Sequence, residues 1–217
     1  MSFTVNPIKF GTDGWRGVIA ADFTFERVAM LAPLAAQVLA DNYGDIASNR
    51  TVIVGYDRRF MAEDFAKLTA TVIQEAGFDV LLSECFAPTP AFSWAAKAHH
   101  ALGAIVLTAS HNPASYLGLK VKSAFGGSVP PEITEQIEAK LGQSLPPADQ
   151  PGKLEMFDPW ASYCQGLQQK VDIAAIKNAI LAEKLKVYVD VMHGAAATGL
   201  ERLLGCPVSE INSDRDP

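Results

Sequence analysis

The stretch Ala104-Ile105-Val106-Leu107-Thr108-Ala109-Ser110-His111-Asn112-Pro113 decides the fold class. Its first four residues are apolar, as in a strand that is covered on both faces, and its last six are small or polar and cannot extend that strand. Ser110 is therefore predicted to lie on a turn directly after a strand. An ordinary turn explains Ser, Asn and Pro here, since all three favour turns. Composition alone favours the ordinary turn, but a phosphate site is the alternative, because backbone N–H groups at a strand end can bind an anion.

The sequence on either side of this stretch alternates between helical and strand patterns. This order predicts an α/β fold, in which a mixed sheet lies between two layers of helices and the ligand site lies beyond the carboxyl ends of the strands. Helices are predicted over 24–39, 65–76, 89–99 and 133–141, and strands over 51–54, 79–82, 104–107 and 119–122.

A change in composition predicts a domain boundary near residue 145. The stretch 145–152 is rich in Pro, Asp and Gln, so we expect a first domain over 1–145 and a linker over 146–158. Residues 159–217 then predict the incomplete start of a second, similar α/β domain, with helices over 160–171 and 195–204 and a buried strand over 185–191. One strand with two helices cannot bury its own faces. This part is therefore expected to belong to a longer chain or to pack on a partner.

Composition excludes several classes of protein. With 49% hydrophobic residues the chain has enough apolar side chains for globular domains, which argues against a disordered protein. Its net charge of −6 argues against a nucleic-acid partner, because binding a nucleic acid needs a basic surface. The sequence shows no signal peptide and no apolar run long enough for a membrane span. The three cysteines are far apart and lack metal-type spacing, so buried thiols in a reducing compartment, the cytoplasm, are expected.

A hydrolase serine is a weaker interpretation of Ser110. The G-x-S-x-G motif that holds such a serine is absent, and His111 is its direct neighbour. A triad base normally comes from another part of the fold.

Residues 108–113, T-A-S-H-N-P, resemble the phosphoserine loop of the α-D-phosphohexomutases, the phosphoglucomutase/phosphomannomutase family. Five further motifs of that family follow the same order along the chain, so the resemblance covers nearly all of it. They are F-G-T-D-G-W-R-G at 10–17, G-Y-D-R-R at 55–59, P-T-P at 88–90, G-L-K-V at 118–121 and D-V-M-H-G at 190–194.

The resemblance implies an isomerase that moves a phosphate reversibly between the 1 and 6 positions of a hexose phosphate. Ser110 is then the phosphoserine, which passes its phosphoryl group to the sugar through a bisphosphate intermediate and whose phosphate is also a ligand of Mg²⁺. Lys120 and Arg16 correspond to family cations that steady the transferring group, and Lys120 can also move a proton. His111 contacts the phosphoserine or positions the substrate, and glucose 1,6-bisphosphate is the implied activator. Such transfers depend on positioning and on neutralising anionic oxygens.

Other family features are missing from the sequence. The metal loop D-G-D-x-D-R, the sugar loop and the C-terminal phosphate loop do not occur, and Asp214-Arg215 matches only the end of the first. We therefore expect these 217 residues to be nearly silent in catalysis without the remaining domains of a parent chain. Asp190 and His193 are spaced like ligands of a metal ion, but the resemblance implies that this segment shapes a domain junction, so no metal is expected there. Leu117 and Ala62 replace Asn and Ser of many members.

Two alternatives stay open. One is a non-catalytic module that binds sugar phosphates or a partner. The other is a phosphoglucosamine mutase, because that branch shares the serine loop, although Met192 before His193-Gly194 favours the glucose and mannose enzymes. The preferred sugar and the oligomeric state are not determined by the sequence.

Overall fold

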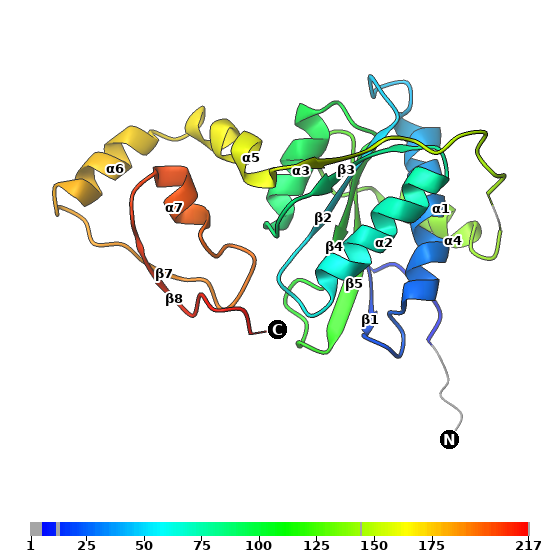
Figure 1. Ribbon diagram of the computed structural model, residues 1–217, viewed down its shortest axis with the longest axis horizontal. Helices are drawn as coiled ribbons and strands as arrows, with labels where there is room; N and C mark the ends of the chain where they lie inside the picture. The colour runs from blue at the N-terminus through cyan, green and yellow to red at the C-terminus, as the bar shows by residue number, and fades with distance from the viewer. Residues whose placement is uncertain (1–5, 12–13, 144, 217) are drawn as a thin grey trace.

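The sheet at the centre of the molecule is mixed and lies between two layers of helices (Figure 1), which confirms the predicted α/β fold. The computed structural model describes residues 6–11, 14–143 and 145–216. The strand order is β1-β5-β4-β2-β3-β6. The strands are β1 (Trp15–Val18), β2 (Thr51–Tyr56), β3 (Asp79–Ser83), β4 (Gly103–Leu107), β5 (Tyr116–Ser123) and β6 (Leu154–Phe157).

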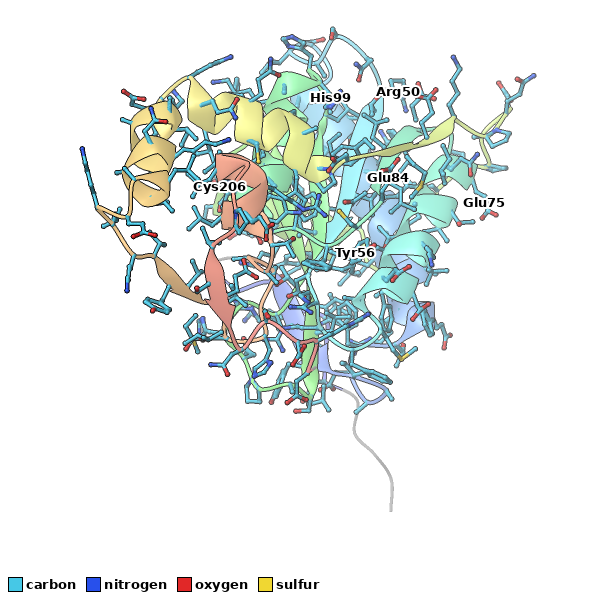
Figure 2. All side chains as sticks on the ribbon, turned by 60° about the vertical axis from the view of Figure 1, so that its left-hand side comes forward. Arg50, Tyr56, Glu75, Glu84, His99 and Cys206 are labelled. Atoms are coloured by element: carbon cyan, nitrogen blue, oxygen red, sulfur yellow. The ribbon has the colours of Figure 1, made fainter. Side chains whose placement is uncertain are left out.

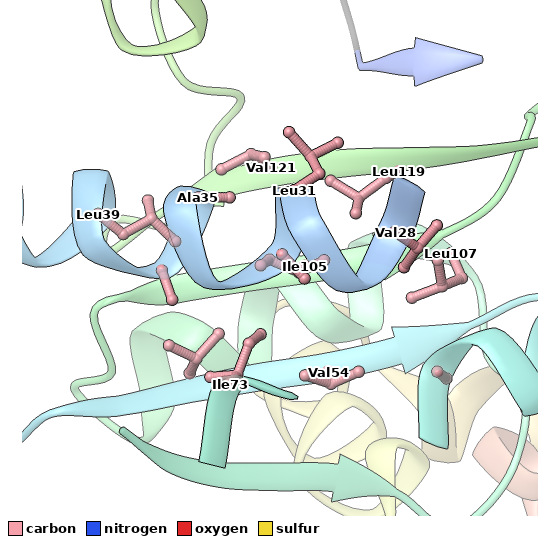
Figure 3. Packing of buried hydrophobic residues seen from close by; sticks show 14 of the residues in the cluster. Val28, Leu31, Ala35, Leu39, Val54, Ile73, Ile105, Leu107, Leu119 and Val121 are labelled. Atoms are coloured by element: carbon pink, nitrogen blue, oxygen red, sulfur yellow. The ribbon is translucent and has the colours of Figure 1, made fainter. Parts of the chain in front are cut away.

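The helices divide between the two faces of the sheet. α1 (Phe25–Tyr43), α2 (Ala62–Glu75) and α4 (Pro131–Ala139) cover one face, and α3 (Thr89–Ala98) covers the other. Figure 3 shows Val28, Leu31, Ala35 and Leu39 of α1 lying over β4 and β5. Those four residues are spaced by three or four positions, which places them on one side of a helix. Thr24 begins α1, because its hydroxyl accepts the N–H of Arg27.

Strand direction decides where a ligand site can form. β4, β2, β3 and β6 run parallel, whereas β5 is antiparallel to β4 and to β1. Tyr56 is the register partner of Leu107, and the Asp57 N–H donates to the Leu107 carbonyl at 3.1 Å. The loops that follow β2 and β4 therefore emerge side by side, at the edge where parallel sheets bind their ligands.

The predicted linker over 146–158 is wrong at its end, because residues 154–157 form β6. This strand pairs parallel with β3, with Val80 opposite Leu154, and the Lys153 N–H donates to the Asp79 carboxylate at 2.7 Å. β6 is an edge strand with three exposed residues, so main-chain pairing holds it in the sheet without a hydrophobic pattern that marks a strand in the sequence. The extent of the domains remains a prediction.

The C-terminal segment, residues 159–216, contains three helices and a two-stranded parallel sheet. The predicted strand over 185–191 is shorter than expected and mostly exposed, and the helix over 173–181 was not predicted. No helix in the described part of the chain is long and apolar enough to cross a membrane. The elements are α5 (Pro159–Gln168), α6 (Ile173–Leu181), β7 (Tyr188–Asp190), α7 (Gly199–Leu204) and β8 (Ser209–Ile211).

Gly55 in β2 is predicted to tolerate no side chain. A Cβ built there would lie 2.3 Å from the ring of Phe92, which is fully buried on α3. Gly55→Ala should therefore lower the free energy of unfolding by about 1–3 kcal/mol through overpacking, measured by urea denaturation. Gly127→Ala is the control, because its Cβ would meet only Ser123 Oγ, at 3.8 Å. Equal midpoints for the two variants would contradict the prediction.

Candidate functional site

A cavity of about 510 Å³ lies where the loops after β2 and β4 emerge. The G-Y-D-R-R, P-T-P and T-A-S-H-N-P motifs all contribute side chains to it, and so does the D-V-M-H-G motif of the C-terminal segment. Motifs that are far apart in the sequence thus meet around one cavity. Its lining includes Asp57, Arg58, Arg59, Pro88, Thr89, Thr108, Ser110, His111, Asn112, Met192 and His193.

Ser110 lies on the turn that was predicted after β4. It is exposed to the cavity, and its φ of 58° is in the left-handed region, which non-glycine residues rarely adopt. The Ser110 N–H donates to the Thr108 hydroxyl at 3.0 Å, and the Asn112 N–H donates to the Ala109 carbonyl at 3.1 Å. This backbone presents the serine side chain at the strand end, and strain of this kind occurs at functional sites.

Arg59 fixes the backbone of the Ser110 loop by hydrogen bonds. Its guanidinium donates to four main-chain carbonyls of that loop, and its side chain is only 14% exposed. A planar group with five fixed donors suits this task. Sequence reasoning assigned no role to Arg59, although the arginine of the G-Y-D-R-R motif was visible. The acceptors are the carbonyls of Ser110 (2.9 Å), Asn112 (2.6 Å), Pro113 (2.9 Å) and Tyr116 (3.0 Å).

Asp57 completes this support. Its carboxylate accepts the Arg59 N–H at 2.9 Å, lies 3.5 Å from Arg59 Nε and is hydrogen-bonded by the Thr108 hydroxyl. A chain of contacts therefore links the Ser110 amide, through Thr108, to a carboxylate and its arginine. Burial raises the pKa of Asp57 above its usual value, and the hydrogen bonds and the charges of Arg59 and Lys120 offset only part of that effect.

The raised pKa of Asp57 predicts a pH dependence of stability. The folded state holds the Asp57 proton more tightly than the unfolded state, so ionisation of Asp57 costs stability as pH rises above its usual value of 3.8. The free energy of unfolding of the wild type, minus that of Asp57→Asn, should fall as the pH rises from about 4, because the pKa of Asp57 is raised in the folded state. Urea denaturation of both proteins checks this. A difference that is flat or rises with pH would contradict it.

The structure separates Lys120 from the cavity that Ser110 and His111 share. Lys120 is 5% exposed, lies opposite Val106 on the α3 side of β5, and lines a neighbouring cavity of about 580 Å³. Thr89 lines both cavities. Gly14 packs on the Lys120 stem, since a Cβ there would lie 3.1 Å from Lys120 Cγ.

Arg16 lies on β1, opposite Gly118. A Cβ at Gly118 would lie 2.9 Å from Arg16 Cγ and 2.8 Å from the Thr108 carbonyl, so Gly118 brings Arg16 close to the start of the Ser110 loop. The Arg16 Nε is buried and has no hydrogen-bond partner among the described residues. Thr12 and Asp13 of the same motif lie outside the described residues.

The C-terminal segment is tied to the same edge of the sheet. Arg58 donates to the Ser213 carbonyl at 2.8 Å, and Arg215 donates to the carbonyls of Arg58 and Arg59, each at 3.2 Å. The Arg58 guanidinium also lies over the Phe86 ring, 4.8 Å from its centroid. Close to this edge the Tyr56 hydroxyl donates to the Glu84 carbonyl at 3.4 Å, and Figure 2 marks both residues.

A metal site formed by protein side chains and a cysteine nucleophile both find little support among the described residues. The described residues contain no group of three or more His, Cys, Asp or Glu side chains that could hold a metal ion. The three cysteines are free, but only Cys206 is buried as predicted, whereas Cys85 and Cys164 are half-buried. Partial burial raises the pKa of the Cys85 and Cys164 thiols, which disfavours a nucleophilic thiolate.

Comparison with known proteins agrees with this geometry. A family model described as phosphoglucomutase/phosphomannomutase, alpha/beta/alpha domain I, matches residues 7–145. A phosphoglucosamine mutase of Acidothermus cellulolyticus is 32% identical over 215 residues, which cover 97% of this chain and 45% of that relative. A phosphoglucosamine/phosphogalactosamine mutase of Sulfurisphaera tokodaii is 32% identical over 216 residues, which cover 96% and 45%.

Solved structures give the same result. The crystal structure of a protein named as a phosphomannomutase, from Thermus thermophilus, superposes with a TM-score of 0.80 and 35% identity. The match covers 96% of this chain and 46% of that one. A phosphoglucomutase from Paramecium shares the fold, with a TM-score of 0.79 at 20% identity. The chain spans less than half the length of the relatives it matches.

Proposed function

Because the chain belongs to the phosphoglucomutase/phosphomannomutase family, we propose that it carries a transferable phosphoryl group on Ser110 and acts in the 1-to-6 isomerisation of hexose phosphates. The observation that carries the proposal is the Ser110 loop. It places a serine at the ligand edge of the sheet, in a strained and exposed turn that the largely buried Arg59 side chain fixes through four carbonyls.

Each side chain has a distinct task in the proposed reaction. Ser110 Oγ attacks a phosphate of a hexose bisphosphate, the P–O bond to the sugar breaks, and the sugar oxygen takes the proton that the serine loses. The reverse step returns the phosphoryl group to a sugar hydroxyl. Arg16 and Lys120 supply positive charge beside the loop, which stabilises the negative oxygens of the transferring group. His111 lines the cavity with Ser110, and its proposed task is to contact the phosphate or the sugar.

Magnesium is part of the proposal only as a requirement of the whole enzyme. The described residues offer no set of ligands for it, and the phosphate on Ser110 is the one ligand that we assign to this chain. No step above passes through the ion. The remaining ligands, and much of the substrate site, are proposed to come from further domains, so this chain alone is expected to turn over little or no substrate.

Phosphopeptide mapping tests the proposal. The protein, together with its longest natural extension, is incubated with glucose 1,6-bisphosphate and Mg²⁺, digested and analysed by mass spectrometry. Phosphate on the peptide that contains Ser110, and its loss when a hexose monophosphate is added, would support a mutase. Ser110→Ala, at a side chain that is exposed in the structure, is the matched control and should carry no phosphate there. Binding of hexose phosphate without any phosphate on Ser110 would instead support a non-catalytic binding module.

The sugar is a separate question. The two curated relatives named above are mutases of glucosamine or galactosamine phosphates by name, and the Thermus thermophilus protein is named as a phosphomannomutase. The Met192-His193-Gly194 sequence instead favours glucose and mannose enzymes. We propose a glucose or mannose phosphate as substrate, with glucosamine phosphate as the alternative. The rate at which phospho-Ser110 is lost on adding each 6-phosphate in turn ranks the three sugars.

A further inference from the structure

His193 faces the Ser110 loop from a different part of the chain. It follows β7 in the C-terminal segment and lines the same cavity as Ser110 and His111. A ligand in this cavity therefore lies between the serine loop and His193. The cavity volume of about 510 Å³ is in the range of small-molecule sites.

The backbone that presents His193 is unusual. Met192 and His193 have φ values of 48° and 57°, so two successive non-glycine residues adopt the left-handed conformation. Hydrogen bonds hold each of them: the Met192 N–H donates to the Asp190 carboxylate at 2.9 Å, and the His193 N–H donates to the Asn212 carbonyl at 2.7 Å. The Asn212 amide also donates to Asp190, at 3.0 Å. Surrounding contacts thus maintain a costly conformation that fixes the position of the ring.

One contact decides the chemistry of the ring. His193 Nδ1 lies 3.0 Å from the main-chain carbonyl oxygen of Asp214. A carbonyl oxygen accepts but cannot donate, so Nδ1 carries the hydrogen of this bond. In the neutral ring Nε2 is then the unprotonated nitrogen and an acceptor of hydrogen bonds. Sugar hydroxyl groups are donors that suit such an acceptor.

We infer that His193 Nε2 accepts a hydrogen bond from a hydroxyl group of the hexose ring whose phosphate lies at Ser110. This inference rests on the proposed function, since it needs a hexose phosphate in the cavity. His193 is assigned as a substrate-binding residue, and neither bond formation nor proton transfer is required of it. The C-terminal segment then contributes to sugar recognition, in addition to its contacts with Arg58 and Arg59.

Nuclear magnetic resonance of the full chain, uniformly labelled with ¹⁵N, tests the inference. Glucose 6-phosphate is expected to shift the Nε2 resonance of His193, together with the amide resonances of the Ser110 loop. Inorganic phosphate should shift only the loop. His193→Ala should weaken binding of glucose 6-phosphate about fivefold to tenfold, as the loss of one hydrogen bond predicts, and should leave binding of inorganic phosphate unchanged. His100→Gln, at an exposed histidine before β4, is the control that should change neither.

The outcomes separate this inference from the proposed function. Loop shifts with glucose 6-phosphate, but an unmoved His193 and unchanged affinity in His193→Ala, would overturn the inference and leave the proposed function standing. Absence of any shift with saturating glucose 6-phosphate would overturn both. A His193→Ala protein that binds inorganic phosphate less tightly would show that the histidine acts through the loop and not through the sugar, which would also overturn the inference.

Discussion

Replacing Arg59 with alanine is expected to lower the free energy of unfolding by about 3–5 kcal/mol, because four loop carbonyls and the Asp57 carboxylate lose their common partner. Asp57 would remain as a buried carboxylate without its arginine. Arg59→Lys should recover little of the loss, since one ammonium cannot reproduce the fork of a guanidinium. Urea denaturation of the three proteins measures these differences.

Hydrogen exchange shows whether the loss is local to the Ser110 loop. The amides of Ser110 and Asn112 should exchange at least about tenfold faster in Arg59→Ala, because their bonds to Thr108 and Ala109 depend on the fixed loop. Arg50→Ala is the control: the Arg50 guanidinium lies over the Phe78 ring at the opposite end of β2, and its removal should cost at most about 1 kcal/mol. Equal losses of stability in Arg59→Ala and Arg50→Ala would contradict the proposed role of Arg59 in fixing the Ser110 loop.

Periodicity predicted the helices and most strands of the main sheet because burial and pattern agree there. Val28, Leu31, Ala32 and Leu39 are fully buried on one side of α1, as their spacing requires, and Thr24 caps the helix where the sequence predicts that it begins. β4 is apolar throughout because both of its faces are covered. In each case the signal and the structure have the same physical cause.

Other elements gave no such signal. β1 has only four residues, and β6 is an exposed edge strand, so main-chain pairing with β5 and β3 holds them in place. No residue of α6 is buried, and the strand predicted over 185–191 keeps only three residues, most of them exposed. The hydrophobic pattern of a sequence is a poor predictor of helices and strands that bury few side chains, because burial is what produces the pattern.

The sequence indicated Ser110 and His111 as neighbours in the candidate site, but it indicated neither the role of Arg59 nor the geometry of the site. The serine loop is visible as polar residues after an apolar strand, and Ser110 and His111 do line one cavity. That Arg59 reaches four carbonyls, or that His193 faces Ser110, depends on strand order and on contacts between segments that are far apart in the sequence. A single sequence contains the residues but not these distances.

Lys120 is the residue whose placement most invites a direct test. It lines a cavity beside the Ser110 cavity, and its charge lowers the pKa of Asp57, which supports the serine loop, so it acts electrostatically on that edge of the sheet. Lys122 lies two residues further along the same face of β5, is 6% exposed and donates to Ser128 at 2.9 Å. The two lysines thus share burial and orientation and differ in distance from the loop.

Lys120→Met, which keeps the length of the side chain and removes its charge, should slow phosphorylation of Ser110 by glucose 1,6-bisphosphate at least about 100-fold, the usual effect of deleting one preorganised positive group beside a transferring phosphate. Lys122→Met should slow this phosphorylation less than about threefold. Lys122 lies two residues further from the Ser110 loop along β5, so its charge interacts more weakly with a phosphate there. Quantitative phosphopeptide mapping over time gives both rates, and urea denaturation confirms that each variant is folded. Equal slowing in two folded variants would mean that the lysines stabilise the β5 face together. Lys120 would then have no special part in the transfer, and the positive charge would have to come from Arg16 or from outside this chain.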